Sequence, residues 1–347
     1  MPTVRPFAAL RYDPAVAGPL EALVAPPYDV ISDLARRDYL ARSPYNVVHL
    51  TLPDSEDGAA RDLAAWREQG ALTQAPEAYW WVAQDYVGPD GVARTREGFA
   101  ASVPAVPYSD GAVLPHERTH AGPKEGRLRL LSATQTQLEP IFLLYDADPV
   151  LARPAGEPAA EVEEGGVRTR IWPVEAGELD LGTPLLIADG HHRYETAVAY
   201  RAEHPEATHT FAILVSSRAP GLEIFPTHRL VQGLGEVAGE EAAGPGEGVT
   251  LYRDGRYLRV SSDEDFGPRV VESLAPEGVS YTAYADEAIA AVDRGEVAAA
   301  FLLEPVTVEQ VARFAQAGET MPQKSTFFYP KLTSGMLFHP VGGAPAA

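Results

Sequence analysis

The segment PLLIADGHHRYETAVAYRAEHPEATHTFAILVS, residues 184–216, carries the clearest structural pattern in the chain. Its opening PLLIA is an unbroken apolar run bounded by turn-forming residues, which predicts a buried strand. After Asp189-Gly190 the apolar residues follow helical spacing, and this helix is expected to stop before Pro205. TFAILVS at 210–216 predicts a second buried strand. A strand, a tight turn, a helix and a strand indicate an α/β fold with α+β elements around a mixed sheet.

The chain on either side of this segment predicts further mixed helix and strand. We expect an N-terminal α+β region, a central core, and a C-terminal α+β region that closes the site, over residues 1–150, 167–232 and 249–340. Residues 151–166 and 233–248 are rich in Pro, Gly, Ala and Glu without apolar periodicity, so they predict linkers or surface loops. Further predicted elements are helices at 57–69, near 285–294 and near 307–317, strands at 140–145 and near 297–303, and hairpins around 88–91 and 254–255.

Composition narrows the functional class. The chain has 347 residues with 49 acidic and 28 basic side chains, a net charge of −21. Such a charge repels both the nucleic-acid backbone and anionic membranes, so we expect neither as a partner. Cysteine is absent, which excludes disulfides, thiolate metal sites and a cysteine nucleophile. The expected partner is a small phosphorylated molecule, and the sequence does not indicate an oligomeric state.

The beginning of the chain lacks the features of a signal peptide. Prolines interrupt MPTVRP at residues 1–6, and no apolar h-region follows. No apolar run approaches the ~18–20 residues that a membrane-spanning helix needs. The expected location is therefore the cytoplasm.

The loop Asp189-Gly190-His191-His192-Arg193 is the main candidate site. It follows a buried strand and opens a helix, where free N–H groups and the helix dipole favour phosphate. Gly190 permits close backbone approach, Arg193 can grip phosphate oxygens, and either histidine can act as acid or base. In the alternative interpretation, Asp189 merely caps the helix and the following side chains are solvated.

A second motif, HERTH at 116–120, matches the H-E-x-x-H signature of zinc hydrolases. In that interpretation His116 and His120 hold the metal and Glu117 is the base. Pro115 before the motif and Pro123 after it leave room for barely one helical turn, which disfavours this reading. The cluster fits an anion site better, with His116, Arg118 and His120 as ligands, and we assign no metal site.

Two later clusters combine cations with imidazole or hydroxyl groups, FPTHR at 225–229 and MPQKSTFFYPK at 321–331. His228 and Arg229 in the first, and Lys324, Ser325 and Lys331 in the second, are candidate phosphate ligands. The alternatives are an ordinary surface turn for the first and a final strand with exposed lysines for the second.

Near the N-terminus, PPYDV at 26–30 places the Asp29 carboxylate in a rigid turn. Asp29 is a candidate catalytic carboxylate. It is also a candidate cap for a helix over 32–41.

These motifs together resemble the bacterial and archaeal domain-of-unknown-function 1015 family, from near residue 2 to near residue 338. The resemblance is carried by PPYDVI at 26–31, PHERTH at 115–120 with Arg127-Leu128, ADGHHRYETA at 188–197, FPTHRL at 225–230 and MPQKSTFFYPK at 321–331. That family is largely uncharacterised, so membership implies little about function.

Residues 170–232 also resemble the phosphate-binding element of the ParB/sulfiredoxin-like fold. Members of that fold bind ATP, ADP or CTP, and some phosphorylate free serine with a DGHHR-type loop. The resemblance implies that residues 190–193 contact phosphates and that Asp189 positions a hydroxyl or Mg²⁺. Two departures matter: sulfiredoxin uses a cysteine that this chain lacks, and the net charge of −21 disfavours the DNA binding of ParB.

The predicted function is phosphoryl transfer on a small metabolite, as kinase or phosphatase, with serine or phosphoserine as leading substrate and ATP or ADP with Mg²⁺ as cofactor. Such chemistry needs cations for the transferring oxygens and a carboxylate or histidine at the nucleophile. The candidates are Arg193, Arg229, Lys324 and Lys331 as cations, His191 or His192 as acid or base, and Asp29, Asp189 or Glu117 as carboxylate. The alternatives are a non-catalytic nucleotide sensor and the metal-dependent hydrolase.

Overall fold

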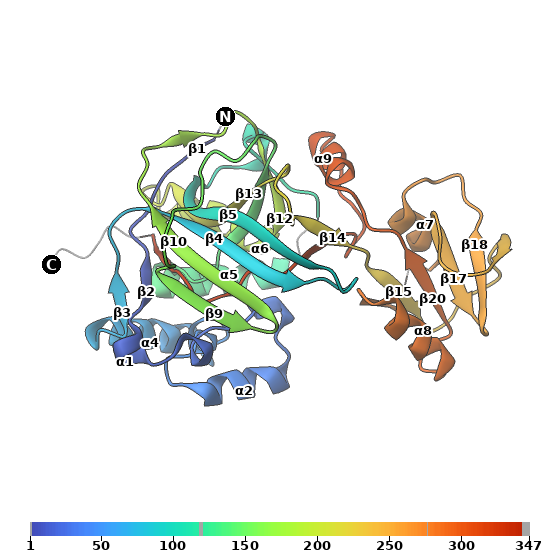
Figure 1. The fold of residues 1–347 in the computed structure, drawn as a ribbon, viewed down its shortest axis with the longest axis horizontal. Helices are drawn as coiled ribbons and strands as arrows, with labels where there is room; N and C mark the ends of the chain where they lie inside the picture. The colour runs from blue at the N-terminus through green and yellow to red at the C-terminus, as the bar shows by residue number, and fades with distance from the viewer. Residues whose placement is uncertain (1, 118–120, 276, 342–347) are drawn as a thin grey trace.

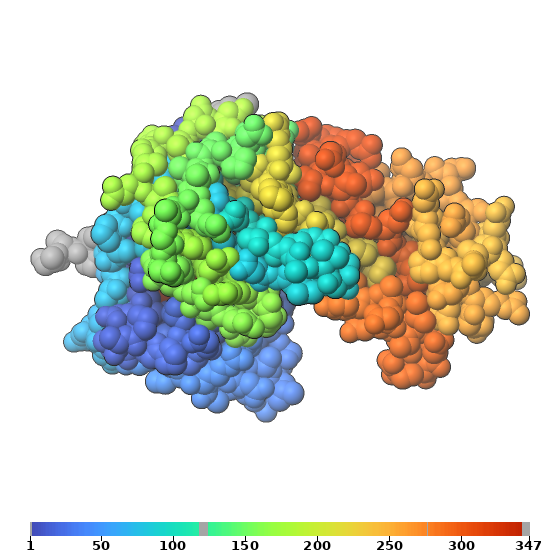
Figure 2. Space-filling model, in the orientation of Figure 1, coloured from blue at the N-terminus to red at the C-terminus, as the bar shows by residue number. Residues whose placement is uncertain are grey.

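The computed structural model describes residues 2–117, 121–275 and 277–341, which form two unequal lobes (Figure 1). The larger lobe is built on an eight-stranded mixed sheet and the smaller lobe on a six-stranded antiparallel sheet. The space-filling view shows a notch between the lobes, below the tip of the hairpin formed by residues 79–104 (Figure 2). Across the described ranges, no helix combines the length and apolar character that crossing a bilayer requires.

The large sheet confirms the predicted mixed α+β fold. Its strand order is β6 (Val113–Leu114), β12 (Leu185–Asp189), β8 (Ile141–Tyr145), β13 (His209–Ser216), β5 (Ala93–Pro104), β4 (Tyr79–Val87), β10 (Val167–Val174) and β9 (Ala160–Glu164). The pairs β12–β6 and β13–β8 are parallel, and the other neighbours are antiparallel. The predicted strands at 140–145, 184–188 and 210–216 and the hairpin around 88–91 are confirmed.

The sheet draws its strands from both the predicted N-terminal region and the predicted core. β8 lies between β12 and β13, which therefore run in opposite directions although α6 (His191–Glu203) alone connects them. Residues 167–232 thus carry no sheet of their own, and their two central strands are held together by a strand that precedes them in the chain. This non-local pairing left no local pattern in the sequence.

Both segments expected as linkers contain an edge strand, and for these residues the loop prediction was wrong. β9 lies within 151–166 and β16 (Gly239–Ala242) within 233–248, each at the outer edge of its sheet. Gly165 and Gly166 have φ of +59° and +76°, so a tight two-residue turn joins β9 to β10. An edge strand with an exposed face needs little apolar alternation, which explains why the pattern was missed.

Helices of the first 134 residues pack beside the large sheet. They are α1 (Pro14–Ala17), α2 (Asp33–Arg42), α3 (Val48–Thr51), α4 (Glu56–Glu68) and α5 (Ala121–Thr134). α4 confirms the helix predicted at 57–69, and α5 packs between α4 and α6. No helix was predicted at α5, because Pro123 disfavours a helix in this part of the chain. Pro123 lies in the first helical turn, where a missing backbone N–H breaks no hydrogen bond.

Short two-stranded pairs complete the large lobe. They are β1 (Thr3–Val4) with β11 (Leu179–Asp180), β2 (Leu10–Tyr12) with β3 (Leu72–Gln74), β7 (Thr136–Gln137) with β22 (His339–Pro340), and β14 (Glu223–Phe225) with β21 (Phe327–Tyr329). The last pair joins the two points at which the chain leaves and re-enters the large lobe.

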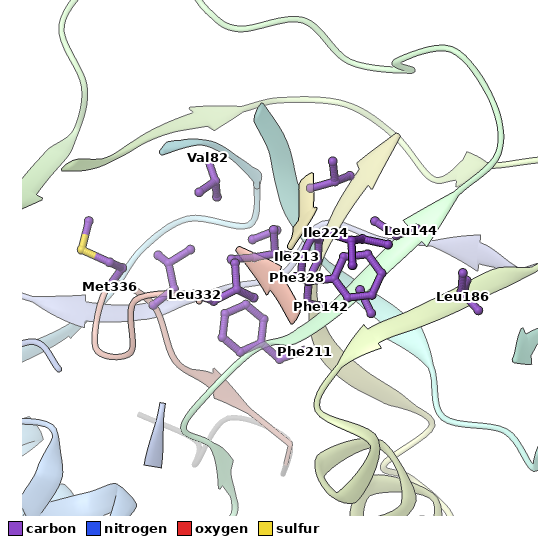
Figure 3. Packing of buried hydrophobic residues seen from close by; sticks show 14 of the residues in the cluster. Val82, Phe142, Leu144, Leu186, Phe211, Ile213, Ile224, Phe328, Leu332 and Met336 are labelled. Atoms are coloured by element: carbon purple, nitrogen blue, oxygen red, sulfur yellow. The ribbon is translucent and has the colours of Figure 1, made fainter. Parts of the chain in front are cut away.

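The C-terminal segment returns into the core of the large lobe. The ring of Phe328 packs against that of Phe142 with centroids 5.8 Å apart (Figure 3). Leu332 and Met336 bury their side chains in the same cluster. Full burial of one such side chain contributes ~1.5–3 kcal/mol, so these residues fix the backbone around Lys331.

The smaller lobe has the strand order β16, β18 (Arg256–Val260), β17 (Val249–Arg253), β20 (Ala299–Leu303), β15 (His228–Val231) and β19 (Val279–Thr282). Its helices are α7 (Gly267–Leu274) and α8 (Ala285–Asp293), and α9 (Val308–Gln316) follows on the way back. The hairpin predicted around 254–255 and the helices and strand predicted between 285 and 317 are confirmed. Phe314 of α9 contacts Phe266, with ring centroids 4.8 Å apart.

Candidate functional site

A cavity of about 500 Å³ opens where β12 ends and α6 begins. Its walls come from the first 30 residues, from the loops at Glu117 and at residues 189–193, from α7 of the smaller lobe and from the C-terminal segment that returns to the large lobe. The lining residues are Tyr28, Asp29, Val30, Glu117, Asp189, Gly190, His191, His192, Arg193, Arg269, Glu272, Thr320, Met321, Pro322, Gln323, Lys324 and Lys331. Segments far apart in the sequence therefore meet at the predicted DGHHR loop.

Asp189 bridges two cations in this cavity. Its Oδ1 accepts a hydrogen bond from Lys331 Nζ at 2.6 Å, and its Oδ2 accepts one from Arg193 Nη2 at 2.8 Å. The Asp189 side chain is 17% exposed. Burial alone raises the pKa of this carboxyl, but Lys331 and Arg193 outweigh burial and hold the pKa well below its usual range. The three groups together carry one net positive charge.

Gly190, not Asp189, caps α6. Gly190 has φ of +92°, and no side-chain hydrogen bond caps the helix. The first intrahelical bond runs from Tyr194 N–H to Gly190 O at 3.0 Å. The alternative interpretation, in which Asp189 caps the helix, is therefore wrong. The N-terminus of α6 instead faces the cavity without a side chain of its own to neutralise it.

His191 and His116 form a buried imidazole pair. Their ring centroids are 4.7 Å apart, and His116 N–H donates to His191 Nε2 at 3.3 Å. Burial, reinforced by the neighbouring His116, lowers the pKa of His191 well below its usual value. A neutral His191 whose Nε2 accepts a hydrogen bond carries its proton on Nδ1, so it is a hydrogen-bond donor.

His116 is fully buried and does not line the cavity. Its Nδ1 lies 2.8 Å from Ile187 O, and its Nε2 lies 3.0 Å from Thr326 Oγ1. Burial lowers the pKa of His116 to about 4. Both ring nitrogens are thus engaged, and His116 supports the loops of the site instead of contacting a ligand.

The zinc-hydrolase geometry is not formed at His116 and Glu117, because both residues precede α5, which begins at Ala121. The predicted ligands Arg118 and His120 lie outside the described residues. Within the ranges that are described, no group of three or more His, Asp and Glu side chains is arranged to hold a metal ion.

Three carboxylates line the cavity besides Asp189, those of Asp29, Glu117 and Glu272. Burial raises the pKa of Glu117, and Asp189 adds to this effect, while Lys324 and Lys331 oppose it. Asp29 lies in a short 3-10 turn over Tyr28–Val30. The helix α2 is capped by Ser32, whose Oγ accepts from Ala35 N–H at 3.3 Å, so the prediction of Asp29 as its cap was wrong.

The Tyr28–Asp29 turn is anchored from below by a buried carboxylate. Tyr28 N–H donates to Glu139 Oε1 at 3.0 Å, and Ser334 Oγ donates to the same oxygen at 2.8 Å. The Arg127 guanidinium lies over the Tyr28 ring at 4.2 Å. These contacts tie the N-terminal motif to the C-terminal segment.

Of the residues predicted as phosphate ligands at 225–229 and 321–331, some line the cavity and others are buried behind it. Lys324 and Lys331 line the cavity, whereas Ser325, His228 and Arg229 do not. Ser325 Oγ donates to Pro322 O at 2.6 Å, and His228 Nδ1 accepts from Leu303 N–H at 3.1 Å. Their roles as direct phosphate ligands are therefore not supported by position.

Arg96 supports Lys331 from beneath and was missed in the sequence analysis. It is 2% exposed, and its Nη2 donates to Pro330 O at 2.7 Å and to Gln84 Oε1. Gln84 Nε2 in turn donates to Lys331 O at 3.3 Å. Burial lowers the pKa of Arg96 to about 10. The residues around Arg96 are polar, so the sequence does not distinguish it from an exposed residue of a strand.

Arg269 and Glu272 of α7 also line the cavity without having been predicted. They lie in an ordinary amphipathic helix, so only the packing of the two lobes reveals them. Tyr28 belongs to the PPYDV motif and also lines the cavity, which was not predicted.

The chain belongs to the family described as protein of unknown function DUF1015, whose sequence profile matches residues 4–245. The chain matches no curated protein sequence. Family membership confirms the main resemblance, whereas the ParB/sulfiredoxin-like similarity stays a prediction.

Several solved structures resemble the chain at low identity and low TM-score. A C-terminally truncated SbnI from Staphylococcus aureus is 11% identical with a TM-score of 0.44, over 70% of this chain and 87% of that one. A free serine kinase in complex with AMP is 14% identical with a TM-score of 0.41, over 65% and 89%. A conserved hypothetical protein from Pyrococcus furiosus is 14% identical with a TM-score of 0.37, over 65% and 93%. Likeness at this level carries no conclusion about activity.

Proposed function

We propose that this member of the DUF1015 family is a phosphoryl-transfer enzyme that acts on a small hydroxyl-bearing metabolite in the cavity at Asp189–Arg193. The observation that carries the proposal is the Asp189 carboxylate, which holds Lys331 and Arg193 together beside the N-terminus of α6, where no side chain caps the helix. Cations and helix N–H groups together form a site for phosphate oxygens.

The cations around Asp189 favour an anion, although the whole chain repels one and the lining as a whole holds four carboxylates beside its four cations. Lys331 and Arg193 carry two positive charges against the single negative charge of Asp189, and Lys324 adds a further cation to the lining. With a net charge of −21, the protein attracts a phosphate only where such a cluster overrides the general field. Preorganised cations of this kind also stabilise the charge on a transferring phosphoryl group.

Glu117 is the general base in this proposal. Its pKa is raised by burial, so it takes a proton from a hydroxyl more readily than an ordinary glutamate does. As the substrate oxygen forms its bond to phosphorus, the hydroxyl proton passes to Glu117 and the bond to the leaving oxygen breaks. Asp189 is a poor base because Lys331 and Arg193 stabilise its ionised form, and it serves to orient those cations. Asp29, at the same cavity, is the alternative base.

The cavity volume of about 500 Å³ suits a nucleotide or a metabolite of similar size. We propose ATP or ADP as the phosphoryl donor. Mg²⁺ bound to phosphates takes only one or two carboxylate ligands, and Asp29 is a carboxylate of the cavity that forms no ion pair with any described cation. The ion neutralises charge on the phosphates when it is bound.

The test is ³¹P NMR of the protein with Mg·ATP or Mg·ADP and a panel of hydroxyl compounds, beginning with serine. The reverse reaction begins with phosphoserine. The proposal expects transfer or hydrolysis by the wild type and its loss in Glu117→Gln or Asp29→Asn. Binding of nucleotide without turnover on any compound in either direction would instead support a nucleotide sensor, and absence of both would reject the phosphate site.

A further inference from the structure

Lys324 holds a backbone conformation that a lysine rarely adopts. Its φ is +56°, and within the described ranges Gln135 and Asp254 are the other non-glycine residues with positive φ. A side chain in this left-handed region costs roughly 1–2 kcal/mol, which glycine avoids. Since Lys324 lines the cavity, the strained position is explained if its ammonium is needed there.

The Lys324 backbone is held from the smaller lobe by Arg229. Arg229 Nη2 donates to Lys324 O at 3.3 Å, and Nη1 donates to Thr227 O at 2.5 Å. Arg229 belongs to β15 and is 4% exposed. It forms no ion pair with any carboxylate of the described chain, although its guanidinium lies 5.6 Å from the Tyr281 ring. Burying an arginine that is not ion-paired is costly, and the hydrogen bonds to the carbonyls of Thr227 and Lys324 offset this cost.

Ser325 and Met321, the neighbours of Lys324 in the chain, form further hydrogen bonds that hold its turn. Ser325 is 2% exposed, and its Oγ donates to Pro322 O at 2.6 Å. Met321 N–H donates to His116 O at 2.9 Å, which ties the start of the turn to the large lobe. The turn is therefore fixed to the large lobe at Met321 and to the smaller lobe at Lys324.

We propose that Arg229 is a positioning residue that holds the Lys324 carbonyl and thereby places the Lys324 ammonium on phosphate oxygens of the bound substrate. The inference rests on the proposed function. It replaces the predicted direct contact of Arg229 with phosphate. It also makes the smaller lobe part of the binding machinery, because Arg229 lies in the central sheet of that lobe.

The test is a double-mutant cycle on the affinity for Mg·ATP, measured by calorimetry with Lys324→Ala, Arg229→Met and the double variant. A charge-assisted hydrogen bond contributes ~1.5–3 kcal/mol, so each single variant should bind on the order of 10–100-fold more weakly. The double variant should bind about as weakly as either single variant, because both changes remove the same contact. The inference would be overturned if the losses of affinity in the two single variants multiplied in the double variant, or if Arg229→Met bound Mg·ATP as tightly as the wild type.

A second pair of variants covers a failure of Arg229→Met to fold. In Arg229→Lys, one ammonium replaces a guanidinium that donates to the carbonyls of both Thr227 and Lys324. An intermediate loss of affinity for Mg·ATP is therefore expected. Lys324→Gly should melt at a higher temperature than Lys324→Ala yet bind Mg·ATP equally weakly. If the wild type binds and Lys331→Met abolishes binding while Lys324→Ala does not weaken it, the proposed function survives and this inference fails. If the wild type does not bind, the proposed function fails first.

Discussion

The ammonium of Lys331 lies 2.6 Å from Oδ1 of Asp189, although 142 positions separate the two residues in the chain. The contact joins the end of β12 to the segment that follows β21. Arg193 occupies the other oxygen of the same carboxylate. The cation cluster therefore exists only when the C-terminal segment has returned to the large lobe.

Replacing Asp189 by Asn should destabilise the fold, because it leaves Lys331 and Arg193 facing each other without a counter-charge. Breaking a buried ion pair by removing one partner costs about 3–5 kcal/mol, and urea unfolding measures this loss. Asp54 also pairs with an arginine, at 2.6 Å, but its side chain is 95% exposed. Asp54→Asn should therefore change the free energy of unfolding by less than about 1 kcal/mol. Equal losses in the two variants would argue against the buried cluster.

Glu117→Gln should lower kcat/KM by about 10²–10⁴-fold while the affinity for Mg·ATP changes little. A base acts in its ionised form, so the wild-type rate should rise with pH through an apparent pKa above the ordinary glutamate value of about 4.3. The variant should lack this rise. A pH profile that keeps its shape in Glu117→Gln would transfer the role to another group, and Asp29→Asn is the next variant to assay.

Gly190→Ala should weaken nucleotide binding as well as stability. Gly190 has φ of +92°, and an added Cβ would lie 3.0 Å from Arg193 Nε, so Arg193 must move. Gly182 is a matched control, with φ of +67° and nothing within 4 Å of an added Cβ. Gly182→Ala should cost about 1 kcal/mol of stability by strain alone and leave the affinity unchanged. Unchanged affinity in Gly190→Ala would show that Arg193 does not contact the ligand.

Stability should fall as the pH drops from about 6.5 towards 4. Burial lowers the pKa of His116, His228 and His339 to about 4 each, so the unfolded state binds more protons than the folded state in this window. For each of these histidines, the free energy of unfolding should therefore fall by about 2 kcal/mol between pH 7 and pH 5.

Urea unfolding at the two pH values checks this dependence. In His228→Asn, whose Oδ1 can still accept the bond from Leu303 N–H, the loss between pH 7 and pH 5 should shrink by that amount. An unaltered dependence in His228→Asn would contradict the burial argument.

Local patterns predicted much of the structure, and long-range pairing did not follow from them. The change from strand to helical spacing at Asp189-Gly190 placed β12, α6 and the main loop of the site correctly. The position of β8 between β12 and β13 depends on pairing across many residues, which local spacing does not record.

The site shows the same division. The loop at 189–193, predicted from its residues and its place between a strand and a helix, lines the cavity. In contrast, H-E-x-x-H at 116–120 matched a signature whose helix does not form at His116. Of the predicted phosphate ligands, Lys324 and Lys331 line the cavity and Arg229 is buried away from it, a difference that the sequence does not show because a buried and an exposed arginine look alike. Arg96 and Arg269 gave no signal, since their roles depend on which segments pack against them.

The most direct measurement is calorimetric titration of Mg·ATP and Mg·ADP into the wild type, Lys331→Met and the control Lys124→Met. Lys124 is ion-paired with Glu195 at 2.7 Å and does not line the cavity, so its loss changes net charge equally without touching the site. We predict that the wild type and Lys124→Met bind at least one of the two nucleotides alike, and that Lys331→Met binds it about 10-fold or more weakly. Equal binding by all three proteins, or none by the wild type, would contradict a phosphate site at Asp189 and Lys331.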